Sequence, residues 1–165
     1  MAFSPIIMGS RADLSHGEAI AAALANFGVD AEIRVASAHK SPHYLLEMLK
    51  TYEADDRAKV YITVAGRSNA LSAMIDAQVT APVIACPPYS DRYGGADIFS
   101  SLRMPSGVAP AVVVAPEGAA LVAAKIFALS EPAVAARVAA AREGMDIKIR
   151  TDDHALRGVR KGSVG

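Results

Sequence analysis

Residues 31–42 of the 165-residue chain read AEIRVASAHKSP, and the rest of the sequence is best interpreted outward from this stretch. The run up to Ala36 is largely apolar and typical of a β-strand, and the final Ser-Pro pair favours the start of a helix. Between them stand Ser37, His39 and Lys40. In parallel α/β sheets, ligands bind where a strand ends and a helix begins. The stretch therefore predicts a strand, a polar loop with a candidate site, and a helix.

The same alternation of strand and helix patterns recurs along the chain. The predicted strands are 2–8, 30–36, 59–65, 81–86 and 109–115, and the predicted helices are 14–27, 41–52, 70–77, 96–102, 116–129 and 131–142. This order predicts an α/β protein with a three-layer, doubly wound parallel sheet of about five strands, flavodoxin-like, with helices on both faces and a C-terminal helical extension. We expect one domain over residues 1–150 and a frayed polar tail over residues 151–165.

The composition argues against several classes of function. Lys and Arg together number 17, as do Asp and Glu, which leaves no general argument for binding nucleic acid or an anionic membrane. No run reaches the ~18 apolar residues of a membrane span. The first residues lead into a strand without a basic region or cleavage site, so we expect a cytoplasmic protein. The single cysteine, Cys86, excludes an intrachain disulfide and fits a buried thiol better than a nucleophile.

Three polar clusters are predicted to meet at one edge of the sheet, because right-handed crossovers place all the strand-to-helix loops there. The clusters are Gly9, Ser10 and Asp13, then Ser37, His39 and Lys40, then Gly66, Arg67, Ser68 and Asn69. Taken alone, Asp13, Ser68 or Asn69 would be explained as a helix cap. Capping requires only one polar residue per loop, whereas these loops carry several, so we favour a ligand site.

The residue types limit the chemistry of that edge. Serine hydroxyls and the cations of Lys40 or Arg67 suit a phosphate or carboxylate, and Asp13 suits sugar hydroxyls. His39 is the candidate general acid/base, because imidazole both donates and accepts a proton near neutral pH. The four histidines are scattered, which argues against a metal site, and no nucleophile elbow supports a serine hydrolase. The residues alone thus predict a sugar-phosphate ligand and acid/base chemistry, but no particular reaction.

Several segments over about residues 5 to 130 resemble the PurE family of purine biosynthesis. They are IMGS at 7–10 with Asp13, SAHK at 37–40, AGRSNAL at 65–71, CPP at 86–88, SLRMPSG at 101–107 and APEG at 115–118. The last four are similar to the class II branch, which includes the carboxylase domain of the bifunctional animal enzyme. Class I members usually carry Arg where this chain has Lys40, and a Gly-Gly-Ala-Ala-His type segment at residues 66–69. Ala12 departs from the family, which commonly has Ser there.

The resemblance implies a reaction: carboxylation of 5-aminoimidazole ribonucleotide (AIR) by carbon dioxide to 4-carboxy-5-aminoimidazole ribonucleotide (CAIR), without ATP, biotin or metal. It implies that His39 shuttles the proton of the ring carbon, and that Lys40 and Ser68, with the Asn69-Ala70 backbone, surround carbon dioxide and the new carboxylate. The implied substrate-binding residues are Gly9, Ser10, Asp13, Ser37, Lys40, Gly66, Arg67, Ser68, Asn69, Met104 and Pro105, of which the last two floor the base pocket.

The resemblance also implies a homo-oligomer, an octamer, whose partners are the small molecules AIR and carbon dioxide. Two alternatives stay open. One is a class I mutase, which moves a carboxyl group from the exocyclic nitrogen of the substrate to its ring carbon. The other is a non-catalytic nucleotide-binding module on the same sheet, which would need no titrating group such as His39 in its cleft.

Overall fold

Five parallel strands form one sheet in the order β2-β1-β3-β4-β5. The computed structural model describes residues 1–157. The strands are β1 (Phe3–Met8), β2 (Asp30–Val35), β3 (Tyr61–Val64), β4 (Val83–Ala85) and β5 (Ala111–Val112). This is the flavodoxin-like strand order, so the predicted fold class is confirmed.

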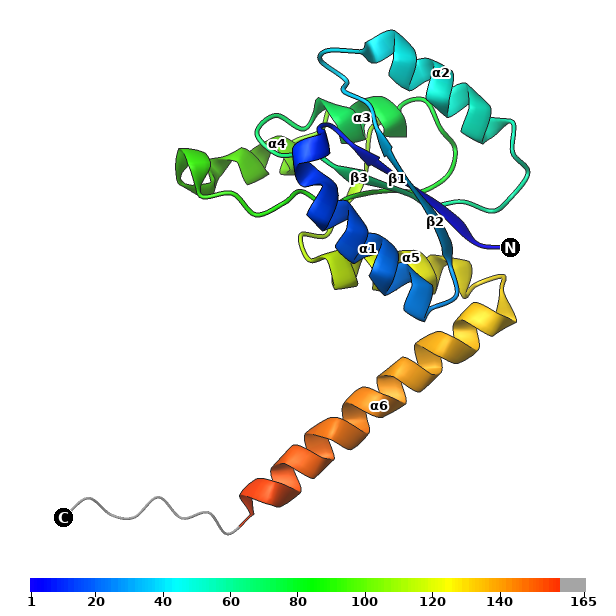
Figure 1. Cartoon of the computed structure of the whole chain (residues 1–165), viewed down its shortest axis with the longest axis vertical. Helices are drawn as coiled ribbons and strands as arrows, with labels where there is room; N and C mark the ends of the chain where they lie inside the picture. Colours follow the sequence, from blue (N-terminus) through cyan, green and yellow to red (C-terminus); the bar gives the residue numbers. More distant parts are fainter. Residues whose placement is uncertain (158–165) are drawn as a thin grey trace, which may run out of the picture.

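Helices cover both faces of the sheet (Figure 1). α1 (Leu14–Asn26) and α5 (Pro116–Phe127) pack on one face, and α2 (Pro42–Glu53) and α3 (Ala70–Asp76) pack on the other. The remaining helical segments are the 3-10 turns η1 (Arg11–Asp13) and η2 (Arg92–Ile98), the short α4 (Phe99–Leu102) and the C-terminal α6 (Pro132–Leu156). Within residues 1–157, no helix is long and apolar enough to span a membrane.

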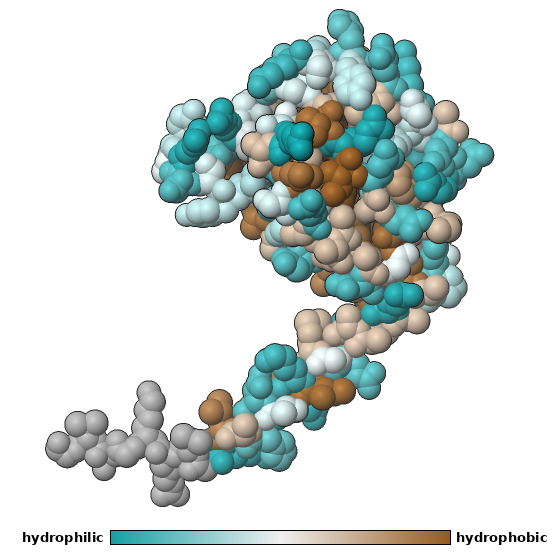
Figure 2. Space-filling view, viewed as in Figure 1, coloured by the Kyte–Doolittle hydropathy of each residue, from teal (hydrophilic) through white to brown (hydrophobic). Residues whose placement is uncertain are grey.

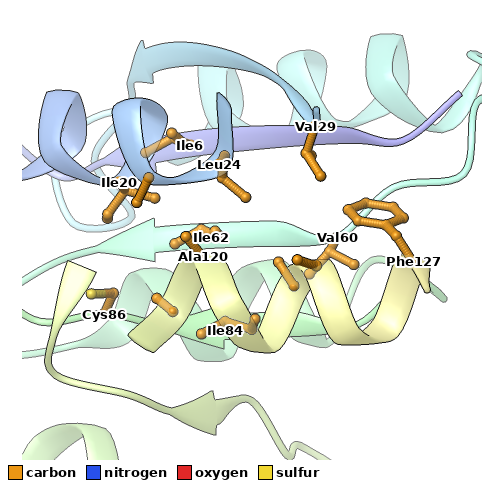
Figure 3. Packing of buried hydrophobic residues seen from close by; sticks show 14 of the residues in the cluster. Ile6, Ile20, Leu24, Val29, Val60, Ile62, Ile84, Cys86, Ala120 and Phe127 are labelled. Carbon is orange, nitrogen blue, oxygen red and sulfur yellow. The ribbon is translucent and has the colours of Figure 1, made fainter. Parts of the chain in front are cut away.

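The central strands are buried on both faces and supply alternate residues to two cores. On β1, Ile6 and Met8 belong to the core under α1 and α5, whereas Ile7 belongs to the core under α2 and α3. Alanines at the α5 interface are fully buried, which lets that helix lie close to the sheet. Figure 3 shows this core, with Ile6, Ile62 and Ile84 of the sheet near Ile20 and Leu24 of α1 and Ala120 and Phe127 of α5.

The last helix is longer than predicted. The sequence predicts a helix ending near residue 142 and a frayed tail from residue 151, whereas α6 continues to Leu156. Its charged side chains pair one helical turn apart, with both Lys148–Asp152 and Arg150–Asp146 at 2.7 Å, and such pairs support an exposed helix. The polar composition of residues 143–156 therefore belongs to a solvent-facing helix and not to a frayed tail. The rest of the predicted tail, residues 158–165, lies outside the described residues.

Candidate active site

The loops that follow β1, β2 and β3 line one cavity of about 910 Å³. β1 lies between β2 and β3 in the sheet, so these three loops are neighbours. The lining includes predicted site residues from all three clusters: Gly9, Ser10, Asp13, Ser37, His39, Lys40, Gly66, Arg67 and Ser68. The structure therefore brings the three clusters together at the carboxyl edge of the sheet.

The first loop presents a hydroxyl and a carboxylate. Ser10 Oγ accepts the backbone N–H of Ala12 at 3.2 Å, which leaves the hydroxyl hydrogen of Ser10 free to donate. Asp13 occupies the N-cap position of α1, but its side chain makes no capping hydrogen bond. Burial raises the pKa of Asp13, while the nearby charges of His16 and Arg67 act in the opposite direction. Asp13 is therefore an uncommitted acceptor at the cavity wall, and the interpretation of its side chain as a cap is wrong.

The second loop holds its backbone rigidly and leaves its functional side chains free. Ser37 Oγ accepts the N–H of Lys40 at 3.3 Å, and Ser41 Oγ accepts the N–H of Ser37 at 3.1 Å. Ser41 stands at the N-cap position before Pro42, as predicted, but its hydroxyl stabilises the loop and makes no capping bond. The side chains of His39 and Lys40 are exposed. The loop thus offers an imidazole and an ammonium group from a fixed backbone.

The third loop contains a strained residue. Arg67 has a φ of 57°, in the left-handed region that costs a non-glycine residue roughly 1–2 kcal/mol. Its backbone N–H donates to Asp97 Oδ2 at 3.1 Å, so a carboxylate from η2 holds this conformation. Strained backbone is enriched at ligand sites. Ser68 follows directly and is exposed on the cavity lining.

Asn69 does not line the cavity, although it was predicted to bind substrate. Its side chain is buried, where Oδ1 accepts the N–H of Ser72 at 3.1 Å and Nδ2 donates to Ser101 Oγ at 2.8 Å. Its backbone N–H donates to Ser100 Oγ at 3.1 Å. These bonds cap α3 and join it to α4. The side chain of Asn69 therefore acts as the N-cap of α3, which is the alternative that its position before a helix offered.

Met104 and Pro105 are likewise absent from the cavity lining, among the residues that the structure describes. They follow α4, where Met104 is half-buried and Pro105 is exposed. A base pocket floored by these two residues is not formed by one chain in this conformation.

The cavity also contains residues that the sequence interpretation missed. His16, in the first turn of α1, lines it, and its Nε2 lies 3.3 Å from Cys86 Sγ. The segment after β4 contributes further residues: Pro88, Tyr89, Ser90, Arg92 and Asp97. The spacing of His16 three residues after Asp13 was a usable signal, because residues at that spacing lie on one side of a helix.

The donor set suits an anionic ligand better than a metal ion. Within residues 1–157, no group of three or more His, Cys, Asp or Glu side chains could hold a metal. Lys40 and Arg67 instead supply positive charge beside the hydroxyls of Ser10 and Ser37. These features define an α/β protein with a polar cavity, suited to an anionic ligand, at the carboxyl ends of its strands.

Comparison with known proteins then identifies the family. The AIR carboxylase family matches residues 5–148, and the chain belongs to this family. The phosphoribosylaminoimidazole carboxylase of Archaeoglobus fulgidus is 55% identical over 152 residues, which cover 92% of this chain and 83% of that protein. The phosphoribosylaminoimidazole carboxylase of Treponema denticola is 52% identical, over 92% of this chain and 96% of that protein.

A solved structure and a longer relative agree with this assignment. The crystal structure of Treponema denticola PurE superposes with a TM-score of 0.93 at 51% sequence identity, covering 94% of this chain and 99% of that chain. The human bifunctional phosphoribosylaminoimidazole carboxylase/phosphoribosylaminoimidazole succinocarboxamide synthetase is 41% identical over 92% of this chain, which corresponds to 36% of that longer protein. The protein is therefore an enzyme, a carboxylase of purine biosynthesis.

Proposed function

We propose that the protein follows the class II reaction, in which carbon dioxide is joined directly to AIR to give CAIR without ATP, biotin or metal. The observation that carries the proposal is the single cavity shared by His39 and Lys40, from the loop after β2, and Ser68, from the loop after β3. An acid/base group, a cation and a hydroxyl are thereby close enough to act on one small substrate.

The chemistry needs few protein groups. The aminoimidazole ring is electron-rich, so its ring carbon can attack carbon dioxide without a covalent enzyme intermediate. A carbon–carbon bond forms, one C=O electron pair moves onto oxygen to make the carboxylate, and the ring carbon loses its proton. His39 accepts that proton, a role that typically contributes roughly 10²- to 10⁴-fold in rate. Holding both reactants in the cavity supplies the rest.

Lys40 and Ser68 stabilise the carboxylate as it forms. Both side chains are exposed on the cavity wall, so neither must break a buried contact to reach a ligand. Charge-assisted hydrogen bonds of this kind are the strong ones in proteins. The backbone donor to this carboxylate is the N–H of Ala70 at the start of α3, because the N–H of Asn69 already donates to Ser100 Oγ.

The nucleotide part of AIR is bound by the first two loops. Ser10 and Ser37 each accept a backbone N–H through Oγ and keep a hydroxyl hydrogen to donate to phosphate. Asp13 accepts from the ribose hydroxyls. Gly66 lines the cavity without a side chain, which lets the imidazole ring lie against the backbone.

Ala12 removes one hydroxyl that the family commonly offers to the phosphate. Arg11 is exposed beside it, and its guanidinium supplies an alternative phosphate donor. A hydrogen bond to a charged group is worth about 1.5–3 kcal/mol, so this exchange alters phosphate affinity without changing the chemistry.

A direct assay separates the class II reaction from the class I mutase. AIR is supplied with bicarbonate and carbonic anhydrase, without ATP, and CAIR formation is followed. Parallel samples receive N5-carboxyaminoimidazole ribonucleotide under carbon-dioxide-free conditions. We expect turnover of AIR and carbon dioxide. Turnover of the N5-carboxylated substrate alone would overturn the class II proposal.

The enzyme is further proposed to act in the cytoplasm as a homo-oligomer, an octamer. Support comes from α6, where Met145, Ile149 and Leu156 expose more than half of their surface, and Figure 2 shows apolar residues among polar ones along this projecting helix. The position of Met104 and Pro105 outside the cavity also leaves room for a second copy to complete it. Light scattering on the eluting protein should give a mass near eight chains, and a monomer would contradict the proposal.

A further inference from the structure

His16 lines the cavity but has no role in the proposed reaction. It lies in the first turn of α1, three residues after Asp13, and is half-buried. The glycine that follows it allows α1 to begin close to the sheet, because a Cβ at Gly17 would lie 2.8 Å from Met8 Sδ. This close approach brings the imidazole of His16 to the end of β4, where Cys86 is fully buried.

The contact with Cys86 engages one ring nitrogen of His16. His16 Nε2 and Cys86 Sγ are 3.3 Å apart, and the same sulfur donates to the carbonyl oxygen of Val114 at 3.8 Å. A thiol has only one hydrogen. When Cys86 donates it to Val114, the hydrogen between Cys86 Sγ and His16 must be carried by Nε2. The other ring nitrogen, Nδ1, takes no part in that contact, and in this arrangement it is an acceptor.

Burial disfavours the charged form of both members of the pair. Burial lowers the pKa of His16, against the opposing effects of a hydrogen bond to the Cys86 backbone and of the carboxylates of Asp13 and Glu117. Burial raises the pKa of the Cys86 thiol to about 12, and the charge of Glu117 acts in the same direction. The imidazole thus acts as a fixed hydrogen-bonding group with an acceptor nitrogen.

One wall of the cavity therefore carries two kinds of acceptor on a single helical turn. Asp13 contributes a carboxylate without a hydrogen-bonded partner within residues 1–157, and His16 contributes an imidazole nitrogen. Two neighbouring acceptors match two neighbouring donors, as in the adjacent hydroxyls of a furanose. A cationic ligand is a poorer match, because Arg67 lies near enough to influence Asp13.

We infer that His16 accepts a hydrogen bond from one of the two ribose hydroxyls of the substrate and, with Asp13, makes the site selective for an intact ribose. The inference rests on the proposed function, which supplies the ribonucleotide. Cys86 and Gly17 are positioning residues in this account, since they act through the orientation of His16.

The test uses three substitutions at one position. His16→Leu removes both nitrogens, His16→Gln keeps a polar atom near the place of Nε2, and His16→Asn keeps one near the place of Nδ1. The substrates are AIR and its 2′-deoxy and 3′-deoxy counterparts. His43→Asn, on the exposed surface of α2, is the matched control.

We expect the Leu and Gln variants to raise KM for AIR by roughly 2- to 10-fold with kcat little changed, the range of one neutral hydrogen bond. They should leave KM unchanged for the one deoxy substrate that lacks the hydroxyl bound by His16, and the Asn variant should recover part of the loss. An equal loss for all three substrates, or a fall in kcat at constant KM, would overturn the inference.

A failure of the class II proposal gives a different result from a failure of the inference about His16. If the unmodified enzyme turns over only the N5-carboxylated substrate, the class II proposal fails, and the same comparison is made with that nucleotide and its deoxy counterparts. If His16→Leu does not fold, as judged by its thermal transition, the Gln and Asn variants carry the test. Equal KM values for these two variants with every substrate would contradict a role for Nδ1.

Discussion

The two edges of the sheet use their polar side chains in opposite ways. At the amino edge, between α2 and β3, Asp55 and Arg57 are paired with each other. Asp55 accepts from the backbone N–H of Arg57 at 2.9 Å and from its Nη2 at 2.6 Å. The Arg57 guanidinium in turn lies 3.8 Å from the centre of the Phe3 ring, and Tyr61 donates to Glu53 at 2.7 Å. These contacts serve the fold.

At the carboxyl edge the functional side chains are left without such partners. Asp13 makes no capping bond, and His39, Lys40 and Ser68 are exposed around a cavity, beside a strained Arg67. A side chain that is already paired must give up that partner before it can bind a ligand, whereas these side chains are available at once. This contrast supports the carboxyl edge as the candidate active site.

The largest effect is expected from His39→Asn. Loss of the acid/base group at the carboxyl edge should lower kcat for AIR carboxylation by roughly 10²- to 10⁴-fold. The melting temperature should stay unchanged, because the side chain is exposed. Steady-state kinetics and thermal melts measure the two quantities, with His43→Asn as the control. Near-normal carboxylation by the variant would show that His39 is not the proton shuttle.

Lys40→Met should have the next largest effect. Removal of a charged hydrogen bond worth about 1.5–3 kcal/mol predicts a roughly 10- to 150-fold fall in kcat/KM for carboxylation. We expect most of the loss in kcat, because the carboxylate forms only as the reaction proceeds. Lys50→Met, exposed on α2, is the control. A loss confined to KM would instead place Lys40 at the phosphate.

Asn69→Ala tests a residue of the carboxyl edge that is already paired. Its removal deprives the N–H of Ser72 of its acceptor and the buried hydroxyl of Ser101 of its donor, and takes away the cap of α3. We therefore expect a loss of about 1–3 kcal/mol in the free energy of unfolding. Urea denaturation at fixed protein concentration measures it, with the exposed Asn26→Ala as control. A large fall in kcat at unchanged stability would assign Asn69 to catalysis.

The smallest effect is expected at the amino edge. Hydrogen bonds from Arg57 lower the pKa of Asp55 from 3.8 to about 2. Because the pKa is lower in the folded state, the stabilisation is present above about pH 4 and is lost as the pH falls toward 2. The melting temperature of Asp55→Asn should therefore lie slightly below that of the unmodified protein at pH 7 and converge with it in acid, while the kinetic constants do not change.

Asp56→Asn provides the matched control, since within residues 1–157 Asp56 forms no ion pair. A melting difference for Asp55→Asn that persists unchanged at pH 2 would show that the ion pair with Arg57 is not its cause.

The order of strand and helix patterns was sufficient to predict the layers of the protein and the edge that carries the candidate site. Alternating strand and helix patterns are local, and right-handed crossovers then place the loops of Ser10, Ser37 and Ser68 on one edge. The residues of those loops were therefore predictable as a group, and so was the fold.

Which polar groups at that edge are free depends on how the elements pack in the folded chain. Asn69 and Ser68 are adjacent and similar in sequence terms, yet one is a buried cap and the other lines the cavity. The contact of His16 with Cys86 joins residues 70 positions apart and depends on how closely α1 packs on the sheet. The physical reason is that periodicity encodes the direction of a side chain from its own element, whereas its partners depend on how distant elements pack.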